Sequence, residues 1–249
     1  MTIESHPLEP FLPPAARILF LGSFPPPRSR WSMDFFYPNF NNDFWRVMGL
    51  VHFSDAQHFV VAGGKRFNYP AVVDFCRQAG LAFFDTASKV RRLKDNASDA
   101  FLEILEPTDV GGLLARLPLC HTLVTTGGKA SEQLATLLRS ASLSPSASPV
   151  LHPEVSPLPS GAPSPVQPPV ADATSPTVIL STSEGTPRIP APSASSSSPE
   201  ASISIPAPGG YVDVTAWGRA LRWWRMPSTS RAYPLALSAK AAAYARLWE

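Results

Sequence analysis

The sequence predicts an α/β fold in which helices cover both faces of a short, mostly parallel sheet. Three observations support this prediction. Strand-like apolar runs alternate along the chain with segments of helical periodicity, which is the pattern of parallel sheets. The 249 residues are enough for one sizeable domain. Hydrophobic residues make up 44% of the chain, an ordinary share for a globular protein, so a core can form.

The first half of the chain supplies two expected strands and three expected helices. Ala16–Phe24 is an apolar run whose Gly-Ser turn is followed closely by three prolines, so we expect a buried strand. Asp43–Leu50 is expected to form a short helix. Pro70–Gly80 opens with proline, has apolar residues at helical spacing and ends at glycine, as helices do. We expect a second strand at Leu81–Ala87 and a helix at Ser98–Leu105.

The second half repeats this alternation. His121–Leu138 has the pattern of a strand, a Gly-Gly turn and a helix, Arg219–Ser230 that of a strand running into a loop, and Leu235–Trp248 that of a strong helix. In parallel sheets, ligands bind beyond the carboxyl ends of the strands. Four loops are therefore expected to converge there: Gly22–Trp45, Asp85–Asp99, Thr126–Lys129 and Met226–Pro234.

Prolines concentrate in residues 140–210, which hold 16 of the chain's 29 prolines and 18 serines but no Phe, Trp or Tyr. Such a composition buries too little apolar surface to offset its backbone entropy, so we expect a disordered insert. The insert interrupts a single domain formed by residues 15–139 and 211–249, and residues 1–14 are expected to be a flexible N-terminus. Thr177–Ser183 could instead form an isolated strand within the insert.

Charge is distributed unevenly. The chain has a formal charge of +2 and the insert of −3, which leaves +5 for the remainder. The last 39 residues hold six Lys and Arg against two acidic residues. This basic cluster is compatible with a phosphate backbone but is not diagnostic of one.

Several classes of protein are disfavoured. The N-terminus lacks the basic and apolar regions of a signal peptide, and no apolar run reaches the ~18 residues that cross a bilayer. Cys76 and Cys120 lack ligand spacing and suggest reduced thiols. His52, His58 and His121 show no metal spacing. We expect a monomer without metal, cofactor or membrane partner, located in the cytoplasm (associated with the nucleoid) or nucleus, and not secreted.

Four motifs, in chain order, carry a resemblance to a known family. The segments "LGSFPP" and "FYPNFNNDFW" resemble motif 1 of the uracil-DNA glycosylase superfamily, and "RMPSTSRAYP" resembles motif 2, the loop that enters DNA. Between motifs 1 and 2, "LAFFDTASKVRRLKDNASD" and "LVTTGGKA" match two strand ends. The pattern is closest to the hypoxanthine-DNA glycosylase branch, and its Met-Pro-Ser is similar to that of mismatch-specific thymine and uracil glycosylases. The resemblance spans residues 15–138 and 211–248. It implies a three-layer α/β/α sandwich and a monofunctional DNA glycosylase that flips hypoxanthine or uracil out of DNA.

The resemblance also implies roles for individual residues. Asn42 and Asp85 would be catalytic. The base would contact Gly22, Ser23, Phe24, Tyr37 and Asn39, with Tyr37 as the stacking ring. DNA would contact Lys129, Met226, Pro227, Ser228, Thr229, Ser230 and Arg231. Phe35, Phe44 and Trp45 are interpreted instead as an aromatic core beneath this loop. Lys129 could also cap a helix.

Two positions depart from the family pattern or leave its interpretation open. Many relatives have an acidic or amide group where this chain has Phe24, and an apolar ring cannot orient water. The hypoxanthine branch is apolar there too. Asp85 replaces a base-reading Asn and accepts hydrogen bonds only, so it would satisfy the ring N–H of uracil and repel the adjacent carbonyl. This favours a purine or a relaxed specificity, although Asp85 could also be a helix N-cap or a loop brace. Two alternatives stay open: a catalytically inactive DNA-binding relative, and an α/β enzyme acting on free nucleotides.

Overall fold

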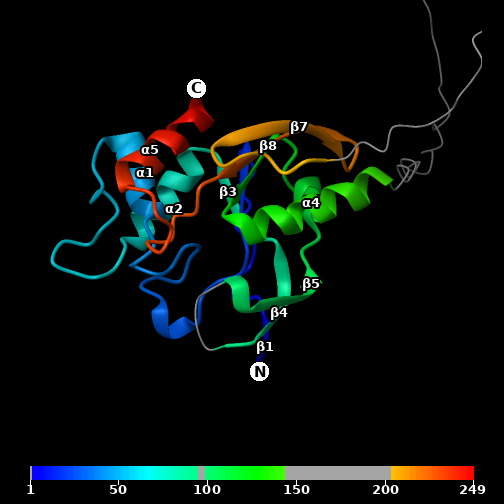
Figure 1. Cartoon of the computed structure of the whole chain (residues 1–249). Helices are drawn as coiled ribbons and strands as arrows, with labels where there is room; N and C mark the ends of the chain where they lie inside the picture. Colours follow the sequence, from blue (N-terminus) through cyan, green and yellow to red (C-terminus); the bar gives the residue numbers. More distant parts are fainter. Residues whose placement is uncertain (1, 95–98, 144–202) are drawn as a thin grey trace, which may run out of the picture. The chain divides into compact units, whose positions relative to one another are not determined.

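A five-stranded sheet lies at the centre of the fold. The computed structural model describes residues 2–94, 99–143 and 203–249. The strands run in the order β3, β2, β6, β8 and β7. Their bounds are Leu81–Asp85 for β3, Ile18–Gly22 for β2, Thr122–Thr126 for β6, Arg219–Met226 for β8 and Gly210–Ala216 for β7. The first four are parallel and β7 is antiparallel to β8 (Figure 1), which confirms the mostly parallel sheet.

The α-helices are α1 (Phe44–Phe53), α2 (Tyr69–Gln78), α3 (Val110–Ala115), α4 (Gly128–Leu143) and α5 (Leu237–Ala245), and the 3-10 turns are η1 (Arg28–Arg30), η2 (Asp99–Phe101) and η3 (Arg246–Trp248). Helices α1, α2, α4 and α5 lie where the sequence predicts them, whereas α3 was not predicted. The start of α2 shows why the local prediction works. Asn68 Oδ1 accepts a hydrogen bond from the Ala71 N–H, and Pro70 has no backbone N–H that would need an acceptor. No helix in the described ranges is long and apolar enough to span a bilayer.

Helices cover both faces of the sheet. The register places Phe20 beside Val124, so these side chains share a face and Thr125 points to the opposite one. The Phe20 ring meets the Phe44 ring of α1 edge-on at 5.4 Å between centroids, and α1 packs against α5. Thr125 Oγ1 lies 2.8 Å from Ser131 Oγ of α4. The three-layer α/β/α arrangement is therefore confirmed.

A second, smaller sheet was not foreseen. It consists of β1 (Thr2–Ser5), β4 (Ala87–Arg92) and β5 (Leu102–Pro107), in the order β1, β4, β5 with antiparallel pairing. The N-terminal segment, expected to be flexible, thus supplies a strand. Farther along, the Phe11 N–H donates to the Phe83 carbonyl at 3.0 Å, which places this segment against β3 as well.

The predicted helix at Ser98–Leu105 is wrong. Its second half is strand β5, where a buried Leu102 and a half-buried Ile104 alternate with exposed neighbours. Glu103 pairs across the ladder with Arg91 at 2.8 Å. The apolar residues of this segment fit helical and strand spacing equally well. Pairing with β4 decides that the segment forms a strand, and the local sequence pattern does not reveal this pairing.

The two ends of the proline-rich insert lie close together in the described residues. Helix α4 runs to Leu143 and β7 begins at Gly210, close to the predicted limits of 140–210. The Arg139 guanidinium donates to the Ile203 carbonyl at 3.3 Å. The possible strand at Thr177–Ser183 lies outside the described residues, and the disorder of the insert stays a prediction.

Candidate functional site

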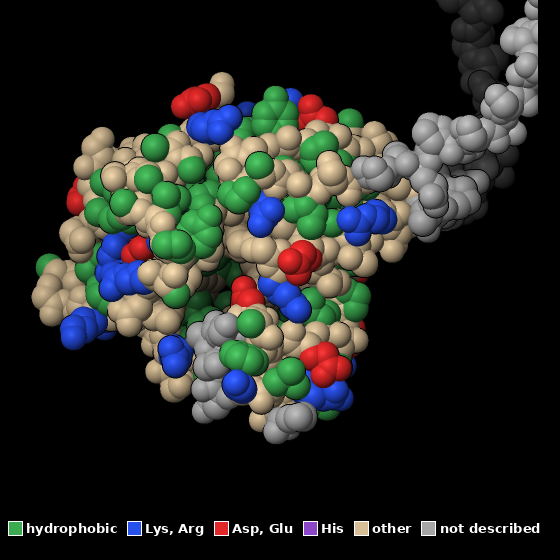
Figure 2. Space-filling model, viewed as in Figure 1, with side chains coloured by type: hydrophobic (Ala, Val, Ile, Leu, Met, Phe, Trp, Pro, Cys, Tyr) green, Lys and Arg blue, Asp and Glu red, His purple; other side chains and the backbone are tan. Residues whose placement is uncertain are grey.

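The four loops predicted to converge do meet at the carboxyl ends of the parallel strands. The Tyr37 hydroxyl lies 2.8 Å from Thr126 Oγ1, which joins the first loop to the end of β6. Ser23 Oγ donates to Asp99 Oδ1 at 2.7 Å, which joins the first loop to η2. Asn42 forms a backbone bridge with Ser230 of the last loop. Figure 2 shows this face hollowed near its centre, beside the start of α4.

Tyr37 stands on a rigid aromatic base. Its ring is stacked on the Phe44 ring with 3.8 Å between centroids and 4° between planes. Its φ of 51° is left-handed, a conformation that costs an aromatic residue on the order of 1–3 kcal/mol and persists where surrounding contacts enforce it. Burial raises the pKa of the phenol, and the nearby Asp85 adds to that rise. Tyr37 itself is half-buried, whereas Phe35, Phe44 and Trp45 belong to the buried core, as predicted.

Asp85 lies against Gly22 at the end of β2. A Cβ on Gly22 would come within 2.3 Å of Asp85 Oδ1 and 3.9 Å of the Tyr37 hydroxyl, so glycine makes room for this carboxylate beside the tyrosine. The other oxygen, Oδ2, lies 3.0 Å from His6 Nε2. Strand β4 follows Asp85, so the alternative of a helix N-cap is wrong.

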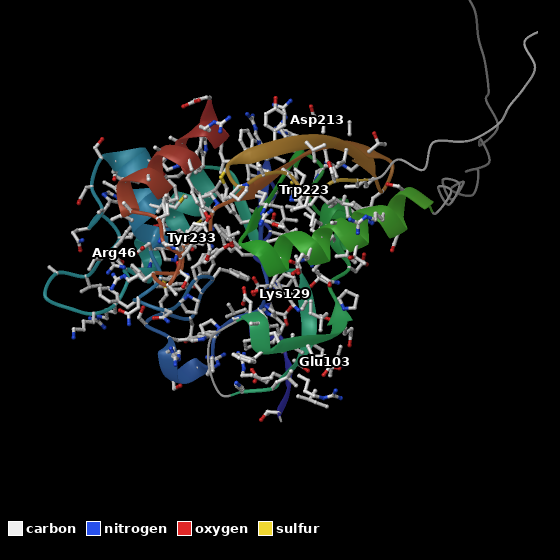
Figure 3. The ribbon with its side chains drawn as sticks, in the orientation of Figure 1. Arg46, Glu103, Lys129, Asp213, Trp223 and Tyr233 are labelled. Atoms are coloured by element: carbon white, nitrogen blue, oxygen red, sulfur yellow. The ribbon has the colours of Figure 1, made fainter. Side chains whose placement is uncertain are left out.

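A second carboxyl group lies on the same side of the molecule. Burial is the main cause that raises the pKa of Asp99, and the negative charge of Asp85 raises it further. The hydrogen bond from Ser23 and the charge of Lys129 act in the opposite direction. Lys129 is the second residue of α4 and lies near the centre of the view in Figure 3. It therefore adds positive charge near Asp99.

Phe24 lies in an apolar cluster separate from the main core. With 8% of its surface exposed, it packs against Ala87, Val90 and Leu102 of the small sheet. Its ring also meets the His6 ring edge-on at 5.3 Å. The position thus contributes hydrophobic packing and no polar group for water.

The two predicted asparagines brace their own loop. Asn42 Oδ1 accepts from the Phe44 N–H at 2.9 Å, at the start of α1. Asn39 Oδ1 accepts from the Asn41 N–H at the same distance. Asn42 keeps an amide donor in addition to this engaged oxygen, because a side-chain amide offers both functions.

The last loop is anchored from below. Met226 is fully buried and Thr229 is 2% exposed, while the Pro227 carbonyl accepts from the Tyr244 hydroxyl at 3.0 Å. Ser228 and Ser230 are half-buried, and a Cβ on Gly127 of the third loop would lie 3.7 Å from Ser228 Cβ. This loop therefore borders the same site as the start of α4.

Arg231 joins the last loop to the first. Its Nε donates to Asp43 Oδ1 at 3.1 Å, and its Nη1 donates to Asn41 Oδ1 at 3.3 Å. Lys240 of α5, only 1% exposed, donates to Asp43 Oδ2 and to the Ser230 carbonyl, both at 3.0 Å. We name Asp43, Arg231 and Lys240 the loop clamp.

Sequence reasoning missed His6, Asp43, Asp99, Thr126 and Lys240. One of them had a signal, because Lys240 stands three residues after Leu237 and four before Tyr244, on the apolar side of α5. A lysine on such a face needs a buried partner. His6 carried no comparable signal, since 79 positions separate it from Asp85.

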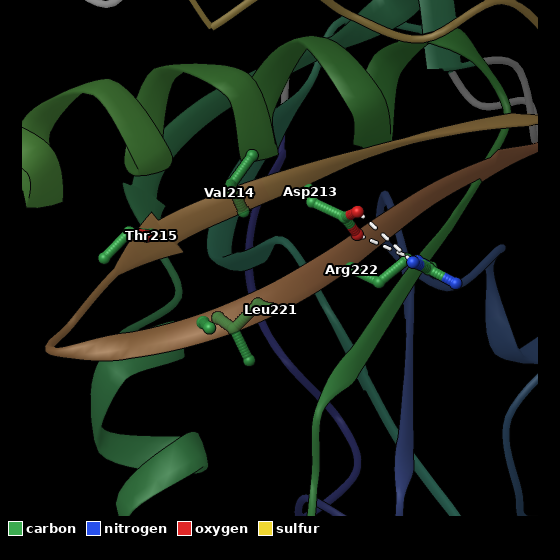
Figure 4. Close-up of a pocket in the computed structure, with 6 residues that line it drawn as sticks. Asp213, Val214, Thr215, Leu221 and Arg222 are labelled. Atoms are coloured by element: carbon green, nitrogen blue, oxygen red, sulfur yellow. Dashed lines mark hydrogen bonds and ion pairs between the residues drawn. The ribbon is translucent and has the colours of Figure 1, made fainter.

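A separate depression of about 300 Å³ lies over the β7–β8 hairpin (Figure 4). Its polar part is the Asp213 carboxylate, paired with Arg222 at 2.8 Å and exposed to solvent. The convergent loops do not line it. In the described part of the chain, no group of three or more His, Cys, Asp or Glu side chains could hold a metal ion.

Comparisons with known proteins give one structural likeness. No family model matches the chain, and no curated protein matches it. The chain is similar to the solution NMR structure of a provisionally assigned uracil DNA glycosylase from Methanosarcina acetivorans. The two are 24% identical over 56% of this chain and 78% of the other, with a TM-score of 0.43. A TM-score of this size does not establish a common fold.

Proposed function

We propose that the protein is a monofunctional DNA glycosylase of the uracil-DNA glycosylase superfamily, which removes a deaminated base, hypoxanthine or uracil. The observation that carries the proposal is the pairing of Tyr37 with Asp85. Tyr37 and Asp85 both lie beside Gly22, which has no side chain. Tyr37 contributes an aromatic ring on a strained backbone, and Asp85 contributes a carboxylate that only accepts hydrogen bonds. They stand where the convergent loops meet, and the motif resemblance assigns this place to the flipped base.

The first step is to hold a base outside the helix. A flipped base loses its neighbours in the duplex and needs an aromatic face in exchange, worth on the order of 1–3 kcal/mol. Tyr37 offers that face, and its stack on Phe44 fixes the ring in advance. A preformed platform lowers the entropy cost of binding.

The second step is to recognise the edge of the base. Uracil and hypoxanthine carry a ring N–H next to a carbonyl, whereas cytosine and adenine carry an unprotonated ring nitrogen at the corresponding edge. Asp85 accepts hydrogen bonds and, when ionised, cannot donate them. The deaminated base therefore gains a bond where its parent base meets repulsion.

The third step is cleavage of the bond between sugar and base. Its transition state resembles an oxocarbenium ion, so charge that develops on the departing base must be stabilised. Phe24 cannot orient water, and Asn42 is proposed to position water or donate to the departing base through its amide. Lys129, Arg231 and the Met226–Pro234 loop are proposed to hold the DNA backbone.

One assay tests the activity. The protein is incubated with single- and double-stranded oligonucleotides that carry uracil, hypoxanthine, xanthine or a G·T mismatch, and alkali then breaks the abasic sites. Strand breaks that Asp85→Ala abolishes and Asp213→Ala leaves unchanged support the proposal. Asp213 is a suitable control because its carboxylate lies on the exposed β7–β8 hairpin. Tight binding without breaks indicates an inactive DNA-binding relative, and neither outcome points to free nucleotides.

A further inference from the structure

We propose that His6 is a positioning residue for base recognition. Its imidazole holds one oxygen of Asp85 so that the other accepts a hydrogen bond from the ring N–H of a deaminated base. This inference rests on the proposed function and adds a part of the chain, the N-terminal segment, that the family motifs do not include.

The His6–Asp85 contact has a defined hydrogen-bond direction. His6 Nε2 lies 3.0 Å from Asp85 Oδ2, and the two side chains are 4% and 11% exposed. Because a carboxylate has no proton to give, the proton of this bond belongs to Nε2. His6 Nδ1 lies 2.8 Å from the Leu8 carbonyl and 3.2 Å from the Leu8 N–H, so it has a partner as donor or acceptor. The neutral and the charged imidazole both hold Asp85 in the same way.

The imidazole has little freedom to move. Its ring lies 4.4 Å from that of Phe84 and 5.3 Å from that of Phe24, measured between centroids. The backbone N–H of His6 donates to the Ser88 carbonyl at 2.8 Å, next to the β1–β4 ladder. Packing and backbone pairing therefore fix the ring before any ligand arrives, as a preorganised site requires.

The second carboxylate oxygen remains available. In the described part of the chain, no side-chain or backbone group donates to Asp85 Oδ1. This oxygen lies against Gly22, whose added Cβ would also come within 3.9 Å of the Tyr37 hydroxyl. One oxygen is thus held by protein, while the other lies beside Gly22 on the side of the Tyr37 hydroxyl. A carboxylate free to rotate would present either oxygen and lose directional preference for a ring N–H.

Two substitutions at His6 separate positioning from packing. His6→Phe keeps an aromatic ring but removes the donor, whereas His6→Gln retains an N–H that can reach Asp85. The test measures the DNA concentration at half-saturation and the single-turnover rate for oligonucleotides that carry hypoxanthine or uracil. It also compares the binding of these oligonucleotides with that of the same sequences carrying adenine or cytosine. In His6→Phe we expect base discrimination to fall about tenfold or more, the effect of about one hydrogen bond to a charged group. The change should appear mainly in half-saturation, and His6→Gln should recover most of it.

A control and a direct observation complete the test. His58→Phe alters an exposed histidine stacked on Phe53, and should leave discrimination unchanged. Long-range ¹H–¹⁵N spectra of the wild type should show a protonated Nε2 on His6. An unprotonated Nε2, or discrimination in a folded His6→Phe within twofold of wild type, overturns the inference. If His6→Phe does not fold, failure of His6→Gln to preserve discrimination overturns it.

The outcomes distinguish this inference from the proposed function. If the wild type cleaves none of the substrates, the glycosylase activity is refuted. Binding discrimination and the His6 spectra still decide whether the imidazole orients Asp85, because neither measurement requires cleavage.

Discussion

Asp43 and Asp85 are equally buried, each with 8% of its surface exposed, yet their surroundings differ. Both oxygens of Asp43 receive hydrogen bonds from cations, Arg231 on one and Lys240 on the other. Among the described residues, Asp85 has a single donor, the imidazole of His6, on one of its oxygens. The difference teaches that burial of a carboxylate does not identify its role. The distribution of donors separates the two: Asp43 is saturated and joins two loops, whereas one oxygen of Asp85 has no donor among the described residues.

The largest effect is expected from breaking the saturated site. Lys240→Met removes the donor to Asp43 and to the Ser230 carbonyl while conserving most of the side-chain volume. Loss of one partner of a buried ion pair costs roughly 3–5 kcal/mol. Arg231 still neutralises the other oxygen of Asp43, so we expect a loss toward the lower end of this range, to which the lost donor of the Ser230 carbonyl contributes. Denaturant unfolding should show a drop of this size in the free energy of unfolding.

The matched control for Lys240 is Lys89→Met. Lys89 pairs with Glu106 at 2.8 Å, but its side chain is 42% exposed. Exposed pairs contribute about 0–1 kcal/mol. If Lys240→Met is as mild as this control, the loop clamp contributes little and the contrast with Asp85 disappears.

Asn42→Ala is expected to have the next largest effect, and it acts on activity. Removing one preorganised donor typically costs ~3 kcal/mol, or about a hundredfold in rate. The lost acceptor for the Phe44 N–H should cost stability of about 1 kcal/mol, as at other helix starts. We therefore expect a folded variant that binds damaged DNA within a few-fold of wild type and cleaves it about a hundred times more slowly in single turnovers.

Asn39→Ala serves as the comparison for Asn42, since its oxygen braces the same loop through the Asn41 N–H. We expect a milder loss of rate. Retention of most single-turnover activity by Asn42→Ala on every cleaved base would mean that this amide is structural. The catalytic role would then pass to Asp85.

Arg231→Ala should have a smaller effect, because it removes only the outer half of the loop clamp. Lys240 still neutralises Asp43, and the Arg231 side chain is 49% exposed, so stability should fall by less than about 1 kcal/mol. Cleavage of duplex should slow more than cleavage of single strands if the side chain fills the gap left by a flipped base. Equal losses on both substrates, with a salt slope of binding lowered by about 1, would indicate a phosphate contact instead.

The sequence predicts β2 and β3 of the large sheet well because each is a local apolar run, whereas it does not predict β7. Ile18–Gly22 and Leu81–Asp85 are buried at every position, which is the pattern of parallel strands covered on both faces. The prediction for Leu102–Pro107 was wrong because the sequence of an edge strand in a small antiparallel sheet resembles that of a short helix until its partner strand is known. Helical spacing alone cannot supply that partner.

The site is predictable to the extent that the loops carry motifs. Gly22 and Asp85 come from the ends of β2 and β3, Tyr37 comes from the loop after β2, and the three lie together. His6 and Lys240 act through side chains that approach from distant segments, so no local pattern assigns them to Asp85 or Asp43. The sequence thus identifies the groups proposed to face a ligand better than the groups that hold them in place.

The smallest effect is expected from removing the proline-rich insert, which should disturb neither carboxylate. From the sequence alone, Ser142–Pro206 would be the segment to replace, but Ile203 and Ile205 pack against the core. Replacing residues 144–202 with a short Gly/Ser linker keeps these contacts and the bond between Arg139 and the Ile203 carbonyl. We expect cleavage rates near those of the full chain and a melting temperature within ~5 °C of it, a shift that corresponds to roughly 1 kcal/mol or slightly more at this size.

A larger drop in melting temperature, measured by calorimetry, would show that the insert packs on the domain. A selective loss of duplex cleavage with an unchanged melting temperature would instead assign the insert a part in DNA binding. The insert would then influence activity in addition to Asp43 and Asp85.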